Sequence, residues 1–212
     1  MFYSSTPNMK QLLQLAAVLA LTLTVGCGQK GVDAPPTTKP GASAANAAPA
    51  ASAKVDGLEA DVIAAAWEGE IAVVQKAVEG GVDVNAKDPA GGGSLLNLAA
   101  IRGHKDLAAF LIEKGADLES KNNEGNTALY NAAFFCHPEL LKLLIEKGAN
   151  VNVTDKQGAK AIDVAKAEWS PELEGIYKFI DGVLKMDLDM AHIKSTRGTI
   201  AEILAGTKPA AK

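Results

Sequence analysis

The sequence contains few residues of the kinds that usually build catalytic or metal sites. It has 2 cysteines and 3 histidines among 212 residues, and aromatic residues make up only 5%. It also lacks a glycine-rich phosphate loop, a nucleophile elbow and a helical H-E-x-x-H pair, the motifs of several large enzyme classes. We therefore expect a protein that is not an enzyme and holds no metal or cofactor.

Basic residues are not in excess either. The chain has 21 lysines and arginines against 25 aspartates and glutamates, which gives a net charge of −4 with histidine neutral. A nucleic-acid-binding surface needs clustered positive charge. We therefore expect no nucleic-acid partner.

The N-terminus carries an apolar run that is too short to span a bilayer comfortably. Lys10 precedes about 14 apolar-rich residues, a length that suits an export signal. The run ends at Gly26-Cys27, which resembles the bacterial lipobox, although Thr24 stands where that motif usually has leucine. The resemblance implies a signal peptide at 1–26 and a lipidated Cys27 as the mature N-terminus. The alternative is a cleaved soluble export signal.

Residues 27–54 are rich in alanine, proline, serine and threonine. With few large apolar side chains to bury, they predict a disordered linker. A flexible chain of this length reaches roughly 25–35 Å, which suits a tether between a membrane surface and a domain at 55–206. Gly28 is not the aspartate associated with inner-membrane retention, so we expect the outer membrane and a periplasmic location. Met9 also fits the translation start of such a signal peptide better than Met1 does.

A heptapeptide occurs twice in the second half of the chain. Leu-Ile-Glu-Lys-Gly-Ala-Asp at 111–117 returns at 144–150, with only the last residue changed, 33 positions later. Upstream, His104 aligns with His137, and paired alanines stay in the same register. A fixed period of about 33 residues is typical of a solenoid whose units stack to bury a core.

These residues resemble the ankyrin repeat, whose pattern runs G-x-T-P-L-x-x-A-A-x-x-G-H and later L-L-x-x-G-A-D-V-N. Weaker copies flank the strong pair, at 62–85 and 158–165. The resemblance covers roughly 57–185 and implies an all-α helix-turn-helix solenoid of about four repeats with short hairpin loops. A generic array of helical hairpins is the alternative.

Several helix ends can be placed from the sequence. Gly115 and Gly148 each follow a lysine, which predicts helix ends with positive φ. Pro138 and Pro171 occupy expected first helical positions. A short helix at 199–206 is expected to cap the solenoid, followed by a tail at 207–212.

In ankyrin-like repeats, the two residues after the paired alanines face the concave groove, where partners commonly bind. Tryptophan, phenylalanine and arginine, which occupy several of these positions, are residue types that carry binding energy, and Glu68 and Glu168 flank the arginine. We therefore predict a partner-binding groove, with the alternative that some of the aromatics turn into the core. The residues are Trp67, Glu68, Ile101, Arg102, Phe134, Phe135 and Glu168.

The sequence thus predicts a monomeric, membrane-tethered, extracytoplasmic module that binds an unknown protein through its concave groove. The alternative is an accessory or inhibitory subunit of a periplasmic enzyme. Cys136 stands where the family has glycine before histidine, and we interpret it as structural.

Overall fold

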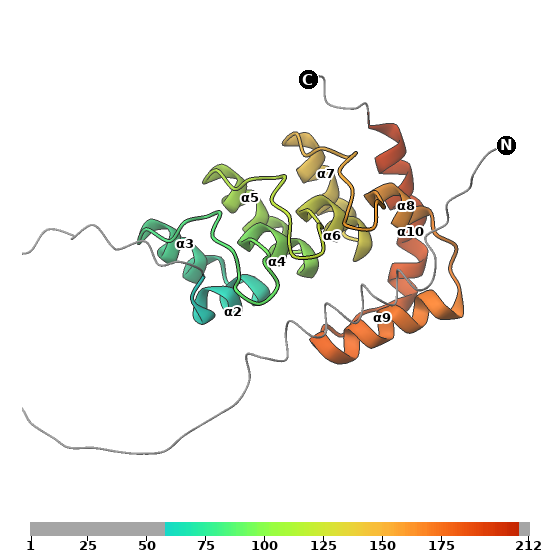
Figure 1. The fold of residues 1–212 in the computed structure, drawn as a ribbon, viewed down its shortest axis with the longest axis horizontal. Coiled ribbons are helices and arrows are strands. Elements are labelled where there is room, and N and C mark those ends of the chain that lie inside the picture. Colours follow the sequence, from blue (N-terminus) through green and yellow to red (C-terminus); the bar gives the residue numbers. More distant parts are fainter. Residues whose placement is uncertain (1–57, 208–212) are drawn as a thin grey trace, which may run out of the picture.

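The computed structural model describes residues 58–207, which form an all-α stack of helical pairs without named strands (Figure 1). The predicted signal peptide, Cys27, the whole predicted linker and the last five residues of the tail lie outside the described residues. The helices are α2 (Ala60–Glu68), α3 (Ile71–Glu79), α4 (Leu95–Arg102), α5 (Lys105–Glu113), α6 (Ala128–Phe134), α7 (Pro138–Glu146), α8 (Ala161–Lys166), α9 (Pro171–Leu184) and α10 (Met190–Gly206).

The first three repeats are the pairs α2–α3, α4–α5 and α6–α7. Their inner helices pack side by side in the order α2, α4, α6, and α8 continues the row. The paired alanines at 99–100 and 132–133 are completely buried, and their small side chains let adjacent helices approach closely. This arrangement confirms the predicted all-α ankyrin-type solenoid.

The helix ends follow the local sequence signals. Gly115 and Gly148 have φ values of 89° and 96°, as predicted for helix ends. Pro138 starts α7, and Pro171 starts α9 behind a Ser170 side chain that accepts a hydrogen bond from the Leu173 N–H. These elements are therefore specified by nearby residues.

The fourth repeat departs from the regular pattern. After α8 the chain does not form an outer helix; α9 instead runs back beside the inner helices, as Figure 1 shows. The helix α10 then packs against α8 and α7, much as α7 packs against α6 and α5. It therefore fills the outer position of the fourth repeat, and α9 is an insertion between that repeat's two helices. The cap begins at Met190, nine residues before the predicted Thr199.

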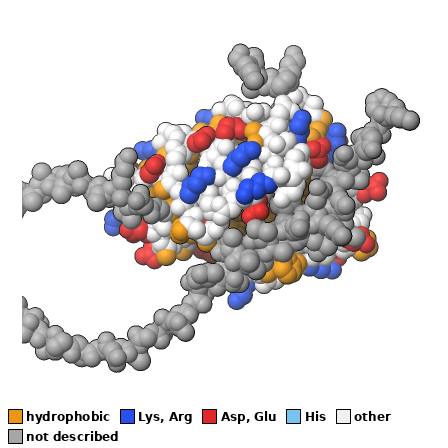
Figure 2. Space-filling view, in the orientation of Figure 1, with side chains coloured by type: hydrophobic (Ala, Val, Ile, Leu, Met, Phe, Trp, Pro, Cys, Tyr) orange, Lys and Arg blue, Asp and Glu red, His pale blue; other side chains and the backbone are white. Residues whose placement is uncertain are grey.

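The hairpin loops join neighbouring repeats through lysine side chains. The Lys87 ammonium donates to the Lys121 carbonyl, and the Lys121 ammonium donates to the Thr154 carbonyl at 2.8 Å. Blue lysine and arginine side chains are visible on the face shown in Figure 2. Between residues 58 and 207, none of the helices combines the length and the hydropathy that a membrane crossing needs.

Candidate functional site

The predicted groove residues lie at the C-terminal ends of the inner helices. Trp67 and Glu68 end α2, Arg102 ends α4 and Phe134 ends α6. Glu168 differs, because α8 stops at Lys166 and leaves this residue exposed in the following loop. The short α8 therefore removes Glu168 from the helical row.

The ends of the four inner helices share one hydrogen-bonding requirement. At equivalent positions near the end of each inner helix, a backbone carbonyl has no hydrogen-bond partner within its helix. A side chain from a later element forms a hydrogen bond with it instead. In the first two repeats the side chain that bonds this carbonyl is a histidine, in the third repeat it is a tyrosine, and in the fourth it is an arginine. The bonds are His104 Nε2 to Trp67 O (2.8 Å), His137 Nε2 to Ile101 O (3.0 Å), Tyr177 Oη to Phe134 O (2.7 Å) and Arg197 Nη2 to Ala167 O (2.9 Å).

The change of donor after the third repeat explains how α9 is held. Ser170 stands where the next repeat histidine would be, and it caps α9 instead. Tyr177, on the second turn of α9, supplies the missing donor and packs its ring 5.0 Å from the Phe134 ring, centroid to centroid. Trp169 also stacks on the Tyr177 ring, with the ring centroids 5.9 Å apart. The tyrosine thus fixes α9 over the third repeat.

The expected exposure of three groove residues is wrong. Ile101, Phe134 and Phe135 are only 7%, 8% and 4% exposed. For Phe134 the physical reason is the inserted helix, since Tyr177 covers its ring. The Phe135 ring packs edge-on against Phe134 at 4.9 Å, and Ile101 belongs to the buried core of the stacked inner helices. This corresponds to the alternative in which the aromatics turn into the core, and their partner-binding role stays a prediction.

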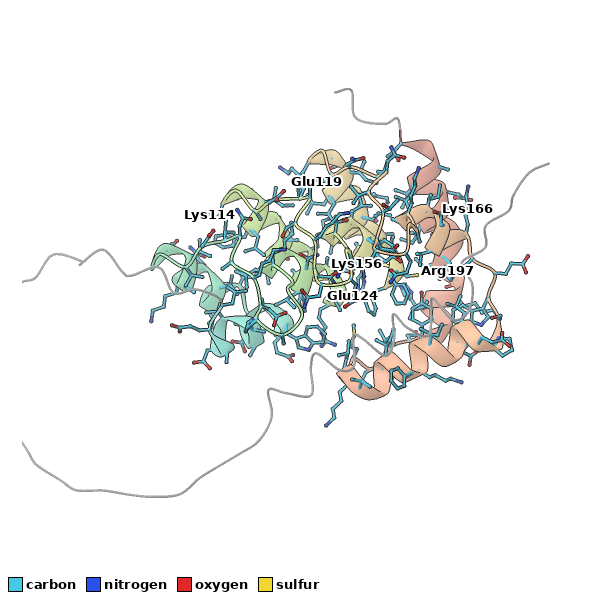
Figure 3. All side chains as sticks on the ribbon, viewed as in Figure 1. Lys114, Glu119, Glu124, Lys156, Lys166 and Arg197 are labelled. Atoms are coloured by element: carbon cyan, nitrogen blue, oxygen red, sulfur yellow. The ribbon has the colours of Figure 1, made fainter. Side chains whose placement is uncertain are left out.

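Arg197 connects the inserted helix to the end of the stack. Its guanidinium donates to the Val164 and Ala167 carbonyls at the end of α8, and to the Tyr177 hydroxyl at 3.0 Å. The residue is 5% exposed, and Figure 3 labels it on α10. Burial raises the pKa of Tyr177 although the Arg197 charge opposes this, so the hydroxyl remains a donor at neutral pH. Three acceptors stabilise a buried cation that would otherwise be costly.

The first two repeats keep a more accessible surface. The Arg102 guanidinium lies 5.4 Å over the half-buried Trp67 ring, 3.9 Å from the exposed Glu68 carboxylate. Its Nη1 donates to the Met186 carbonyl at 3.4 Å, where the chain leaves α9. Its buried Nε has no hydrogen-bond partner among the described residues. The structure therefore brings the predicted residues Trp67, Glu68 and Arg102 together.

A small recess opens beside Trp67, between the inner helices and the hairpin tips. The sequence analysis did not identify its apolar wall, which includes Leu98 and Leu184, or its buried acid, Glu124. Leu98 lies one turn before Arg102, a spacing that could have been noticed; Leu184 comes from the inserted helix, and no local signal places it there. The lining residues are Trp67, Asp88, Gly91, Gly93, Asn97, Leu98, Ile101, Asn122, Glu124 and Leu184.

The remaining reactive side chains have structural surroundings. Cys136 adopts φ +59°, where the equivalent residues are Gly69 and Gly103. Burial raises the pKa of its thiol to about 11 despite the Arg197 charge, so it is protonated at neutral pH. In the part of the chain that the structure describes, no three His, Cys, Asp or Glu side chains gather as a metal site.

A family comparison agrees with this geometry. A sequence model described as "Ankyrin repeats (3 copies)" matches residues 62–155, which span α2 to the third hairpin tip. Residues 62–155 are ankyrin repeats. Ankyrin repeats are typically non-catalytic and suggest a protein–protein interaction module.

Two curated proteins are similar to part of this chain. The chain is 41% identical over 61 residues to "Ankyrin repeat domain-containing protein 40" from Mus musculus, and equally to the protein of that name from Homo sapiens. The aligned segment is 29% of this chain and 17% of each relative. The chain therefore spans about a sixth of the length of these relatives.

Proposed function

We propose that this chain is a non-catalytic, monomeric module that binds a protein partner through the inner face of its first two repeats. The observation that carries the proposal is the pairing of a half-buried Trp67 with Arg102, whose guanidinium lies 5.4 Å over the ring and whose side chain is 20% exposed. Tryptophan and arginine are the residue types that most often dominate binding energy. The recess beside them supplies a concave surface with apolar walls and few polar groups, as binding sites usually have.

The inserted helix limits where the partner can bind. The third repeat contributes little surface, because Tyr177 covers Phe134. Glu68 remains exposed at the edge of the open part. The binding surface is therefore shorter than the predicted groove, and it runs from α2 to α4 and the hairpin tips.

The proposed tether comes from the sequence. An apolar run that ends at Gly26-Cys27, followed by an Ala- and Pro-rich stretch to residue 54, supports a lipid anchor on Cys27 and a periplasmic location at the outer membrane. Cys27→Ala should release the protein from membranes. Mass spectrometry of the mature N-terminus decides this, and an unmodified N-terminus at another residue would contradict it.

The binding proposal is tested by site-specific photocrosslinking in the native cell envelope. A photoreactive amino acid replaces Glu68, which is exposed beside Arg102, and a matched variant carries it at Phe179, an exposed position on α9. We expect one discrete crosslinked protein from position 68 that is absent from position 179 and lost when Trp67→Ala is added. Equal crosslinking from both positions would refute binding at the inner face. An enzyme captured at position 68, with altered activity, would support the accessory-subunit alternative.

A further inference from the structure

We propose that the recess binds a lysine or arginine side chain of the partner, with Glu124 as its counter-ion. This inference rests on the interaction function proposed above and specifies the chemistry of the partner. The bound segment is a basic peptide in which the cationic residue extends between the hairpin tips and the inner helices.

Glu124 is a buried carboxylate without a structural role in its turn. It is 7% exposed, and no residue in 58–207 donates a hydrogen bond to its carboxylate. The turn is shaped by Asn122, whose side-chain oxygen accepts the Glu124 and Asn126 N–H groups at 2.9 Å each. The equivalent positions in the neighbouring hairpins hold Gly91 and Gln157, so the fold does not require an acid here.

The other buried acids at the hairpin tips already accept hydrogen bonds on both carboxylate oxygens. Asp88 accepts the N–H groups of Ala90 and Gly91 at 2.9 and 2.7 Å. Asp155 accepts the Tyr130 hydroxyl at 2.9 Å and two backbone N–H groups of its own turn. Of the two acids between residues 58 and 207 that line the recess, Asp88 and Glu124, only Glu124 has a carboxylate that accepts no hydrogen bond from those residues. Asp88 adds a second negative charge to the lining.

No cation of the described chain fills this place. Lys156, from the next hairpin, donates its backbone N–H to the Glu124 carbonyl at 3.0 Å, and both residues are labelled in Figure 3. The Lys156 side chain is exposed and makes no ion pair with Glu124 within 4.0 Å, although its charge partly offsets the effect of burial on the Glu124 pKa. Arg102 is turned toward Glu68 and Trp67.

The walls of the recess fit the stem of a long basic side chain. Its apolar lining comes from Leu98 and Ile101, which are buried, and from the half-buried Trp67 and Leu184. Lysine and arginine pack their methylene stems on such apolar surface while the charged end reaches a polar partner. The recess offers about 40 Å³, and a water-sized group needs roughly 10–15 Å³, which leaves room for about three such groups. That matches the end of one lysine side chain better than an aromatic ring.

The test uses a random dodecapeptide phage library selected on the immobilised protein. We expect wild type to enrich peptides with lysine or arginine beside apolar residues. Glu124→Gln should lose that enrichment, while Glu113→Gln, an exposed acid on the outer helix α5, should keep it. The melting temperature of each variant is measured in parallel, and Glu124→Gln should melt no lower than wild type.

A selected peptide then gives a quantitative check. Replacing its basic residue by norleucine should weaken binding to wild type by about tenfold or more, and should have little effect on Glu124→Gln, since partners in one contact are not additive. Peptides enriched without basic residues, but lost in Trp67→Ala, would overturn this inference and leave the proposed function standing. Failure to select any peptide that depends on Trp67 would count against both.

Discussion

The Tyr177 hydroxyl donates a 2.7 Å hydrogen bond to the Phe134 carbonyl, the position that a repeat histidine meets in the two preceding repeats. A single residue on α9 therefore replaces the histidine whose hydrogen bond links successive repeats. Its ring also covers the Phe134 ring, so the same side chain satisfies the backbone and closes the inner face of the third repeat.

Tyr177→Phe should destabilise the protein by about 1–3 kcal/mol, because the Phe134 carbonyl and one Arg197 donor would be left buried and unpaired. Urea denaturation measures the change. Phe179→Ala is the matched control on the same helix; it is 47% exposed and should change stability by about 0.5 kcal/mol or less. A Tyr177→Phe variant as stable as wild type would show that the hydroxyl does not hold α9.

Arg197→Met should be more costly, at about 3 kcal/mol or more, since three acceptors at α8 and Tyr177 lose their donor together. Combined with Tyr177→Phe, the two effects should not add, because both remove the same network. A double-mutant cycle by urea denaturation measures the coupling. Strict additivity would mean that the two residues act independently.

The sequence alone was sufficient to predict the repeats, but it was not sufficient to predict the inserted helix α9. The period, the paired alanines and the Gly115 and Gly148 helix ends depend on residues close in the chain, and these predictions are confirmed. The covering of Phe134 depends on Tyr177, 43 residues later, and no local pattern gives the direction of α9. The replacement of the repeat histidine by Ser170 was the one available signal that the fourth repeat changes.

Phe134→Ala should cost about 3–5 kcal/mol, because the ring is buried against Phe135 and Tyr177. An exposed groove residue would instead tolerate the change. Thermal melts compare it with Trp67→Ala, whose half-buried ring should cost less. A Phe134→Ala protein that melts like wild type would indicate an open groove at the third repeat.

Two glycine-to-alanine substitutions should have opposite signs. Gly115 has φ +89° and open space around its missing side chain, so Gly115→Ala tests backbone strain alone and should cost about 1–2 kcal/mol. Gly175 lies inside α9, with equally open space and without positive φ, so Gly175→Ala should stabilise by about 0.5–1 kcal/mol. Melting temperatures that move in the same direction would contradict this account.

The stability should fall in mildly acidic solution because of His137. Burial lowers the pKa of this histidine below 6.5, with smaller contributions from His192, His104 and Arg102, while its bond to the Ile101 carbonyl acts in the opposite direction. Between the unfolded and the folded pKa, the unfolded chain binds more protons. The free energy of unfolding therefore decreases as pH falls from about 6.5 through the lower folded pKa, and His137 contributes no pH dependence above that range.

The measurement is the melting temperature of wild type and His137→Gln from pH 5.5 to 8. The variant should be less stable at pH 8, where it has lost the ring that meets the Ile101 carbonyl. Its melting temperature should nevertheless decline less steeply below pH 6.5, since it has no imidazole to protonate. Glu124 has a pKa raised by burial and gains stability from acidification, but it is present in both proteins and cancels in the comparison. Parallel curves for the two proteins would show that protonation of His137 is not coupled to unfolding.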